Sequence, residues 1–379
     1  MKKLIAFSLA AALLATTSVQ ADSVFAPPPP DIAGRAYILN DFYSGQTLAA
    51  RDPDTRVEPA SLTKLMTAYL TFKALKEKRL TLDQTLTVSE KGWKTEGSRM
   101  FLDPKIPATV NDLIHGMIIQ SGNDACVTLA EAIAGSEEVF GQMMSREARR
   151  LGMNGTHFVN ATGLPGANHY TTVRDLGTLA NALIRDFPEF YPIYSKKEFR
   201  YNNITQANRN LLLYRDPNVD GMKTGYTDSA GYNLIASSHR DGRRVVSVVV
   251  GTSSPEARAV ESSKLLNFGV QFFDTPRLYT ARKSLGMVPV FKGQSSTVSI
   301  GVPADVYVSI PKGTARQVKL EMTTQKPLIA PIKAGQTVGK ITMVLDGKIL
   351  GERQVVALSE VPEAGFIGRF IDSVKLLLN

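Results

Sequence analysis

The amino-acid sequence predicts an α+β fold, in which an antiparallel sheet packs with a cluster of helices, followed by a small all-β domain and a C-terminal amphipathic helix. Apolar residues at helical spacing dominate residues 59–187. From residue 219 the pattern changes to β-branched runs, two of which are joined by Asp241-Gly242, a strong hairpin signal. Helices in one part of the chain and hairpin-linked strands in another are typical of the α+β class.

The N-terminus has the form of a secretory signal peptide over residues 1–21. Lys2 and Lys3 supply a positive start, residues 4–14 form an apolar run, and Ala21 ends a small-residue cleavage signal. The apolar run is shorter than a typical membrane-spanning helix. After it, residues 22–33 include four consecutive prolines and predict a stiff, extended arm.

A first domain is expected over residues 34–274. Pro59 favours a helix start at this point, because proline fits the first turn of a helix. The predicted helices cover residues 59–78, 110–119, 124–133, 137–151, 173–187 and 256–273. The predicted strands cover residues 37–41, 46–48, 87–89, 219–227, 231–237 and 244–250.

A second domain, which is all β, is expected over residues 275–359. Turn signals such as Asp346-Gly347 separate short β-branched runs, which predicts a small sandwich or barrel. These runs are residues 288–290, 296–300, 306–310, 318–322 and 341–345.

The last segment, residues 360–379, predicts an amphipathic helix. Its large apolar residues share one helical stripe, with polar residues largely opposite. The stripe consists of Phe366, Ile367, Phe370, Ile371, Val374, Leu377 and Leu378. The segment is too short and too polar to span a bilayer, but it can lie flat on one.

The composition excludes several classes of function. The net charge is +9, but the 44 basic residues are scattered and form no stripe interleaved with aromatic residues, so nucleic acid is not an expected partner. The four histidines lack the spacing of a zinc site, and neither a metal nor a cofactor is expected. Cys126 is the only cysteine, which excludes an internal disulfide and fits a buried, inert thiol.

Ser61 and Lys64 are the first candidate catalytic residues. They lie three residues apart in the opening turns of a predicted helix, so both side chains lie on one face. A hydroxyl held beside an amine is a nucleophile with its base. A lysine is a base only when it is neutral, so its pKa must fall by roughly 3 units from about 10.4. Burial and a nearby cation both lower the pKa of a lysine, so the hypothesis predicts a second lysine close in space.

Two further motifs follow along the chain, Ser121-Gly122-Asn123 on an interhelical turn and Lys223-Thr224-Gly225 on a predicted strand. The set and its order are those of the serine penicillin-recognising enzymes, and Lys223 is the second lysine that the first motif demands. With their flanks, the motifs resemble D-alanyl-D-alanine carboxypeptidases of the low-molecular-mass penicillin-binding protein 5/6 type. These flanks are residues 59–67, 119–125, 218–225 and 230–234.

The resemblance extends over nearly all of the chain after residue 21 and implies a β-lactamase/transpeptidase-like fold for the first domain. It also implies a role for each catalytic residue. Ser61 is the acylated nucleophile, Lys64 is its base, and Ser121 relays the proton to the leaving amine. Asn123 holds the substrate amide or Lys64, and Lys223 lowers the pKa of Lys64.

The resemblance assigns the remaining site residues to substrate binding. Thr224 and Arg209 match the family's pair for the terminal carboxylate, which an arginine binds with two hydrogen bonds. The strand that carries Gly225 would pair with the substrate backbone. The backbone N–H groups of Ser61 and Tyr226 would form the oxyanion hole. Close relatives often have histidine in place of Tyr226, a change that leaves the N–H donor intact.

The implied reaction is removal of the terminal D-alanine from peptidoglycan pentapeptides through an acyl-enzyme on Ser61, with covalent acylation by β-lactams. The alternatives on the same scaffold are a transpeptidase or endopeptidase and a weak β-lactamase. Glu189 lacks the surroundings of the glutamate that activates water in class A β-lactamases. A non-catalytic wall-binding protein would need neither Ser61 nor Lys64. The family resemblance places the protein, once exported, at the periplasmic face of the inner membrane, held peripherally by the C-terminal helix.

Overall fold

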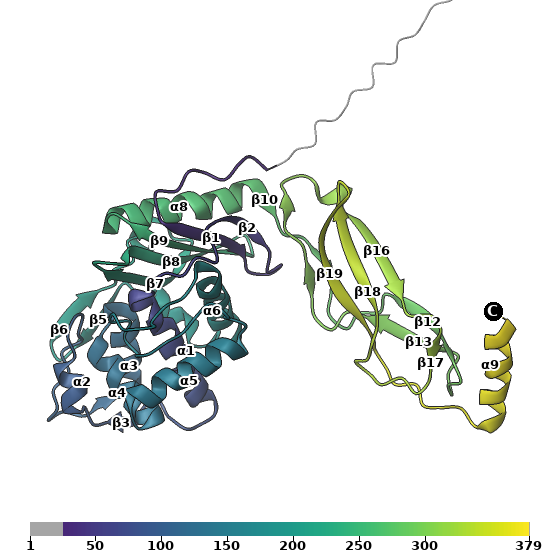
Figure 1. Ribbon diagram of the computed structural model, residues 1–379, viewed down its shortest axis with the longest axis horizontal. Coiled ribbons are helices and arrows are strands. Elements are labelled where there is room, and N and C mark those ends of the chain that lie inside the picture. The colour runs from purple at the N-terminus through teal and green to yellow at the C-terminus, as the bar shows by residue number, and fades with distance from the viewer. Residues whose placement is uncertain (1–25, 379) are drawn as a thin grey trace, which may run out of the picture.

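The computed structural model describes residues 26–378, so the predicted signal peptide at residues 1–21 lies outside the described residues, as do residues 22–25 and Asn379. The chain forms two lobes joined end to end (Figure 1). The first lobe combines a sheet with most of the helices, and the second lobe is built mainly of strands.

A five-stranded antiparallel sheet forms the centre of the first lobe, in the order β2-β1-β9-β8-β7. Its strands are β1 (Ala36–Asp41), β2 (Thr47–Arg51), β7 (Val219–Thr227), β8 (Gly231–Arg240) and β9 (Arg243–Thr252). Asp241 and Gly242 have φ values of 50° and 74° in the turn between β8 and β9, as the Asp-Gly pair predicts. The strand order leaves β7 at the edge of the sheet.

Helices cover both faces of this sheet (Figure 1). Because side chains alternate along a strand, Ile38 and Val248 join the core shared with the helical cluster, whereas Leu39 and Val249 pack toward α8 (Pro255–Phe272). The helical cluster comprises α1 (Lys64–Lys76), α2 (Glu90–Lys94), α3 (Val110–His115), α4 (Asn123–Ala134), α5 (Glu137–Arg150) and α6 (Val173–Asp186). The lobe also holds the short helix α7 (Leu212–Arg215), the antiparallel pair of β3 (Thr85–Leu86) with β4 (Ala108–Thr109), and the hairpin of β5 (Glu198–Tyr201) with β6 (Ile204–Ala207).

Two predicted elements of the first lobe differ from the structure. The strand expected at residues 87–89 is wrong: β3 ends at Leu86, and the Ser89 hydroxyl instead caps α2 by accepting from the Gly92 N–H at 2.9 Å. The helix expected at residues 110–119 changes its winding, because Gly116–Gln120 continues α3 as a π-helical turn. Such a turn is frequent at functional sites, and here it delivers the chain to the Ser-Gly-Asn motif.

The second lobe is organised around a six-stranded sheet in the order β16-β18-β19-β13-β12-β17. Its strands are β12 (Gly286–Phe291), β13 (Thr297–Gly301), β16 (Lys319–Thr324), β17 (Leu328–Ile329), β18 (Thr337–Leu345) and β19 (Lys348–Ala357). The strand expected at residues 306–310 is divided, since β14 (Val306–Tyr307) pairs with β11 (Arg277–Tyr279) and β15 (Ile310–Pro311) pairs with β10 (Phe273–Asp274). The α+β class of the first domain and the all-β character of the second are confirmed. The boundary predicted at residues 274 and 275 stays a prediction.

Asp41 is the centre of a polar junction between the lobes. Its side chain is completely buried, and it accepts hydrogen bonds from the Ser44 N–H (2.9 Å), the Thr275 hydroxyl (2.6 Å) and the Arg243 Nε (3.1 Å). The Ser44 hydroxyl in turn lies 2.7 Å from that of Ser309 in the second lobe. One carboxylate thus ties together the end of β1, the start of β9 and the second lobe.

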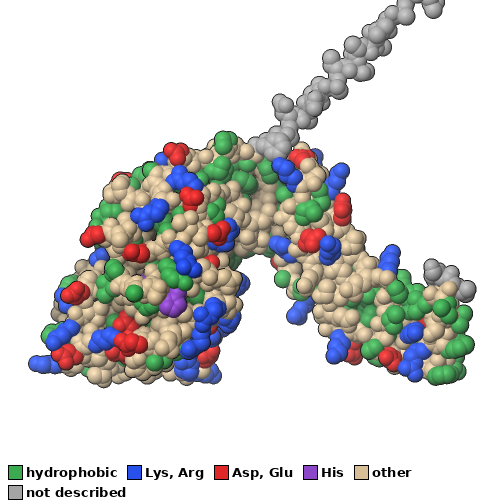
Figure 2. Space-filling view, viewed as in Figure 1, with side chains coloured by type: hydrophobic (Ala, Val, Ile, Leu, Met, Phe, Trp, Pro, Cys, Tyr) green, Lys and Arg blue, Asp and Glu red, His purple; other side chains and the backbone are tan. Residues whose placement is uncertain are grey.

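Helix α9 (Phe366–Leu378) lies at the far end of the second lobe, away from the first (Figure 1). Its apolar stripe from Phe366 to Leu377 faces outward, and these two residues are exposed to 78% and 86%. Figure 2 shows the hydrophobic side chains gathered on this end of the molecule. The polar side is held to the lobe by Asp372, whose carboxylate accepts from the Lys292 N–H at 2.7 Å. No helix within residues 26–378 has the length and apolar character needed to cross a membrane.

Candidate active site

The chain around Ser61 forms a tight, strained turn at the start of α1. Residues Ala60–Thr63 make a 3₁₀ turn, and α1 follows from Lys64. Ala60 has a φ of 48°, a left-handed conformation that is costly for a residue with a side chain. Gly163 packs directly on this turn, so closely that a Cβ there would lie 1.8 Å from the Ala60 carbonyl oxygen. The surrounding chain therefore holds Ser61 in one position at the mouth of a pocket.

The Lys64 amine is buried beside the Ser61 hydroxyl. Its Nζ lies 3.1 Å from the Ser61 Oγ, 2.7 Å from the Asn123 Oδ1 and 2.6 Å from the Thr162 carbonyl oxygen. The amide and carbonyl oxygens can only accept, so they take two hydrogens of the amine. In the neutral amine the remaining position is a lone pair, and the geometry directs it at the Ser61 hydroxyl. This is the arrangement that a general base needs.

Burial lowers the pKa of the Lys64 amine below its ordinary value, and the positive charge of Arg209 lowers it further. Lys223 is also buried, and its pKa lies well below the ordinary value, first because of burial and then because of the charge of Lys64. Coulombic coupling between two amines is reciprocal, so the role of Lys223 in lowering the pKa of Lys64 stays a prediction.

The Ser121-Gly122-Asn123 motif lies where the π-helical turn meets α4. The Asn123 amide makes a hydrogen bond at each end, since its Nδ2 donates to the Glu96 carbonyl oxygen at 2.5 Å while its Oδ1 accepts from Lys64. Of the two predicted partners of Asn123, the structure thus shows Lys64. Ser121 has a left-handed backbone with a φ of 68°, and its buried hydroxyl has no hydrogen-bond partner within residues 26–378. A buried hydroxyl without a partner is available to a substrate atom.

Strand β7 forms the opposite wall of the site and carries the Lys-Thr-Gly motif. The Lys223 amine donates to the Thr224 carbonyl oxygen at 3.0 Å. The residue is buried and does not line the pocket. Gly225 allows β7 to approach the turn of Ser61, because a Cβ there would lie 3.3 Å from both the Ala60 Cβ and the Leu62 N. This close approach explains why the motif ends in glycine.

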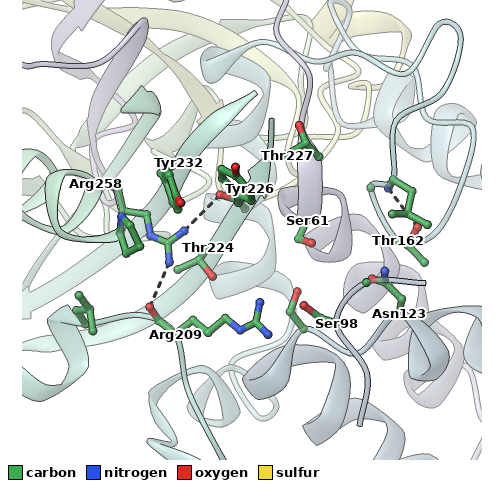
Figure 3. A pocket seen from close by; sticks show the side chains of 17 residues that line it. Ser61, Ser98, Asn123, Thr162, Arg209, Thr224, Tyr226, Thr227, Tyr232 and Arg258 are labelled. Atoms are coloured by element: carbon green, nitrogen blue, oxygen red, sulfur yellow. Dashed lines mark hydrogen bonds between the residues drawn. The ribbon is translucent and has the colours of Figure 1, made fainter. Parts of the chain in front are cut away.

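A cavity of about 670 Å³ opens between these two walls (Figure 3). Most of the predicted residues line it, whereas Lys64 and Lys223 lie behind its surface. The predicted residues in its lining are Ser61, Ser121, Asn123, Arg209, Thr224, Gly225 and Tyr226. Glu189, the residue weighed for a β-lactamase, is not in the lining and lies on the surface after α6.

Arg258 is the most important pocket residue that the sequence did not predict. It comes from α8, is 6% exposed, and reaches the Gly225 carbonyl oxygen at 3.4 Å and the Arg209 carbonyl oxygen at 3.5 Å (Figure 3). Burial, and next the charge of Arg209, lower the pKa of its guanidinium to about 10. Within the described part of the chain no carboxylate pairs with it, so two arginines face one pocket. In the sequence nothing distinguishes Arg258 from the other basic residues.

Other lining residues were also absent from the predicted site. They are Gly97, Ser98, Thr162, Gly163, Leu164, Leu211, Thr227, Tyr232 and Pro255. Tyr232 packs against Tyr226 with ring centroids 4.3 Å apart, and the Tyr226 hydroxyl donates to the Asp228 carboxylate at 2.6 Å. That hydrogen bond and the charge of Asp228 raise the pKa of Tyr226 to about 12. The Tyr226 ring thus lies in the lining of the pocket and is 46% exposed.

Comparison with known proteins extends over both lobes. A model of the D-alanyl-D-alanine carboxypeptidase family matches residues 23–254, and a model of the C-terminal domain of penicillin-binding protein 5 matches residues 273–363. The chain is 41% identical to D-alanyl-D-alanine carboxypeptidase DacA of Escherichia coli (strain K12) over 361 residues, which cover 93% of this chain and 90% of that protein.

Solved structures agree with the sequence comparison. Penicillin-binding protein 5 from Haemophilus influenzae superposes with a TM-score of 0.86 at 40% identity, covering 89% of this chain and all of that one. Penicillin-binding protein D2 from Listeria monocytogenes, in its ampicillin-bound form, superposes with a TM-score of 0.60 at 31% identity, covering 64% of this chain and 100% of that one. The similarity runs through the first lobe and continues into the second, and on this ground the chain belongs to the D-alanyl-D-alanine carboxypeptidases, a family of serine penicillin-binding proteins.

Proposed function

We propose that Ser61 attacks the peptide carbonyl of a D-alanyl-D-alanine terminus and becomes acylated, with release of the last D-alanine. The single observation that carries this proposal is the Lys64 amine, whose two acceptor contacts leave its lone pair facing the Ser61 hydroxyl 3.1 Å away. Lys64 takes the hydroxyl proton as the Oγ–carbon bond forms. In the second half of the reaction a water molecule attacks the ester and frees Ser61.

Ser121 passes the proton to the leaving amine. Its hydroxyl is buried, lines the pocket and has no partner within residues 26–378, which suits a group that contacts substrate only during the reaction. The backbone N–H groups of Ser61 and Tyr226 stabilise the oxyanion, because they belong to the two walls that approach each other at Gly225. Lys223 holds the β7 backbone through the Thr224 carbonyl oxygen and adds positive potential when it is protonated.

Arg209 and Thr224 bind the terminal carboxylate of the substrate. Both line the pocket, and burial lowers the pKa of the Arg209 guanidinium, so an anion that pairs with it is favoured. The substrate backbone extends along β7, which is an edge strand with one side free for pairing. The physiological substrate is the pentapeptide of peptidoglycan, and no cofactor is required by this chemistry.

β-Lactams acylate the same serine and act as covalent inhibitors. The ampicillin-bound relative from Listeria monocytogenes supports this assignment, since its fold matches 64% of this chain.

Mass spectrometry tests the proposal directly. A penicillin added to the purified protein should increase the intact mass by one adduct, and peptide mapping should place the adduct on Ser61. Ser61→Ala should lose the adduct while keeping its melting temperature. With a pentapeptide ending in D-Ala-D-Ala, free D-alanine and a tetrapeptide should appear. Cross-linked product in place of the tetrapeptide would identify a transpeptidase, and an adduct on another residue would exclude Ser61.

The outward stripe of α9 supports a second proposal, that the protein is exported and held at the periplasmic face of the inner membrane. The signal peptide at residues 1–21 directs export. Asp372 holds one side of α9 to the second lobe, whereas the apolar residues of the helix are exposed. These residues are therefore free to enter a membrane surface. The second lobe then stands between this surface and the active site.

A further inference from the structure

Glu58 bridges the two walls of the active site. It lies three residues before Ser61, and its Oε2 accepts from the Ser229 hydroxyl at 2.5 Å and, at the longer distance of 3.5 Å, from the Thr227 hydroxyl. Ser229 and Thr227 belong to the other wall, where β7 ends and turns into β8. Thr227 and Tyr226 line the same pocket as Ser61 (Figure 3).

The side of this bridge that donates, formed by Thr227 and Ser229, is itself an ordered turn. The Thr227 hydroxyl accepts from the Ala230 N–H at 3.0 Å and lies 3.3 Å from the Ser229 hydroxyl. Arg35 donates to the Ser229 carbonyl oxygen at 3.2 Å. Glu58 forms no ion pair within residues 26–378. No cation in this part of the chain therefore competes with Ser229 and Thr227 for its carboxylate.

The position of this bridge matters because the two oxyanion donors belong to separate elements. The Ser61 N–H is on the strained turn before α1, and the Tyr226 N–H is on β7. As an edge strand, β7 is fixed by hydrogen bonds to β8 on one side only. Van der Waals contact at Gly225 limits how close the two walls come, but it does not stop them from moving apart. A directional hydrogen bond between the two walls, such as that from Ser229 to Glu58, resists this separation.

We propose that Glu58 is a positioning residue, whose hydrogen bonds to Ser229 and Thr227 set the spacing of the two oxyanion donors. This inference rests on the proposed function. This positioning role requires a hydrogen-bond acceptor at residue 58 and involves no proton transfer. Glutamine keeps an acceptor oxygen, so Glu58→Gln should retain the function that Glu58→Ala loses. A displacement of about 1 Å at a catalytic group costs about 100-fold in rate, which sets the scale of the effect.

The experiment measures the acylation rate constant and the preceding non-covalent affinity separately, by stopped-flow with a fluorescent penicillin. Glu58→Ala should slow acylation about 10- to 100-fold and change the non-covalent affinity less than about threefold. Glu58→Gln should stay within about threefold of the wild type in both. Ser229→Ala should slow acylation less than Glu58→Ala does, and the double variant should be no slower than Glu58→Ala alone, because both changes break one bridge.

Asp54→Ala is the matched control, because Asp54 lies four residues earlier and its carboxylate accepts two hydrogen bonds from Arg174 on the surface, at 2.6 and 3.0 Å. It should acylate like the wild type. An unchanged rate in Glu58→Ala overturns the inference, and so does an equal loss in Glu58→Gln. If Glu58→Ala does not fold, the exposed Ser229→Ala decides, and an unchanged rate there also overturns the inference. Failure of the wild type to acylate would overturn the proposed function instead.

Discussion

Asn123→Asp should move the pH dependence of acylation to higher pH. The Asn123 Oδ1 lies 2.7 Å from the Lys64 Nζ, so the substitution places a negative charge against an amine that has to be neutral to act. At that distance two unit charges attract by about 1.5 kcal/mol in water and about 6 kcal/mol at an effective dielectric of 20. Since 1.36 kcal/mol corresponds to one pKa unit, the pKa of Lys64 should rise by at least about 1 unit, and by about 1–3 as is usual for close pairs.

The sign follows from which form of Lys64 reacts. The acylation rate rises with pH as Lys64 loses its proton, and it levels off above the pKa of Lys64. Burial and Arg209 lower that pKa in the wild type, so the rise occurs at lower pH than it would for a free lysine. A higher pKa in Asn123→Asp moves the rise toward alkaline pH. At a fixed pH on the slope, the rate should therefore fall about tenfold for every pH unit that the midpoint moves, while the alkaline plateau changes less.

The assay is the rate of penicillin acylation between pH 5 and about pH 10, a range that covers the expected midpoints of both proteins. Asn123→Ala is the control, because it removes the same acceptor without adding a charge. It should lower the plateau, since Lys64 loses one of the contacts that direct its lone pair, but it should move the midpoint little. An unchanged midpoint in Asn123→Asp, with the protein folded, would mean that Lys64 is not the base whose titration limits acylation.

Four further outcomes are expected. Lys64→Arg should be nearly inactive in acylation, because a guanidinium stays protonated; substantial activity would place the base elsewhere. Arg209→Ala should lower kcat/KM for a D-Ala-D-Ala peptide more than it lowers penicillin acylation, and equal losses would argue against a role in carboxylate recognition. Deletion of residues 362–379 should release a soluble protein that still binds penicillin, whereas the full chain should stay with membranes in high salt because apolar burial dominates; pelleting of the shortened chain would refute the anchor. Asp41→Ala should lower the free energy of unfolding by about 3 kcal/mol in denaturant titrations, because it removes the buried carboxylate that accepts from the partly buried Arg243 and Thr275; an unchanged value would show that the junction contributes little.

Local patterns in the sequence determined much of the fold. The predicted strand at residues 219–227 has the same bounds as β7, and Asp241-Gly242 predicted the hairpin between β8 and β9. Both depend on neighbours in the chain, through alternation of side chains and through the φ values that a tight turn allows. The pairing of Ser61 with Lys64 was predictable for the same reason, since three residues at a helix start place both side chains on one face.

The three short motifs also identified the chemistry, because a nucleophile, a buried amine and a carboxylate-binding wall each need particular residue types. Their order in the chain was sufficient to indicate the family. The sequence separations of residues 64, 123 and 223, however, do not give the distances between their side chains.

Only the tertiary structure decided what surrounds the reacting groups. The Thr162 carbonyl oxygen, which helps to direct the Lys64 amine, lies 98 residues away in sequence, and Arg258 enters the pocket from a helix on the far face of the sheet. That β7 is an edge strand depends on the order of the whole sheet, and that Arg209 helps to lower the pKa of the buried Lys64 depends on how the lobe packs. Electrostatic and hydrogen-bond energies change steeply over a few ångströms, and such separations between distant residues arise only when the lobe has packed.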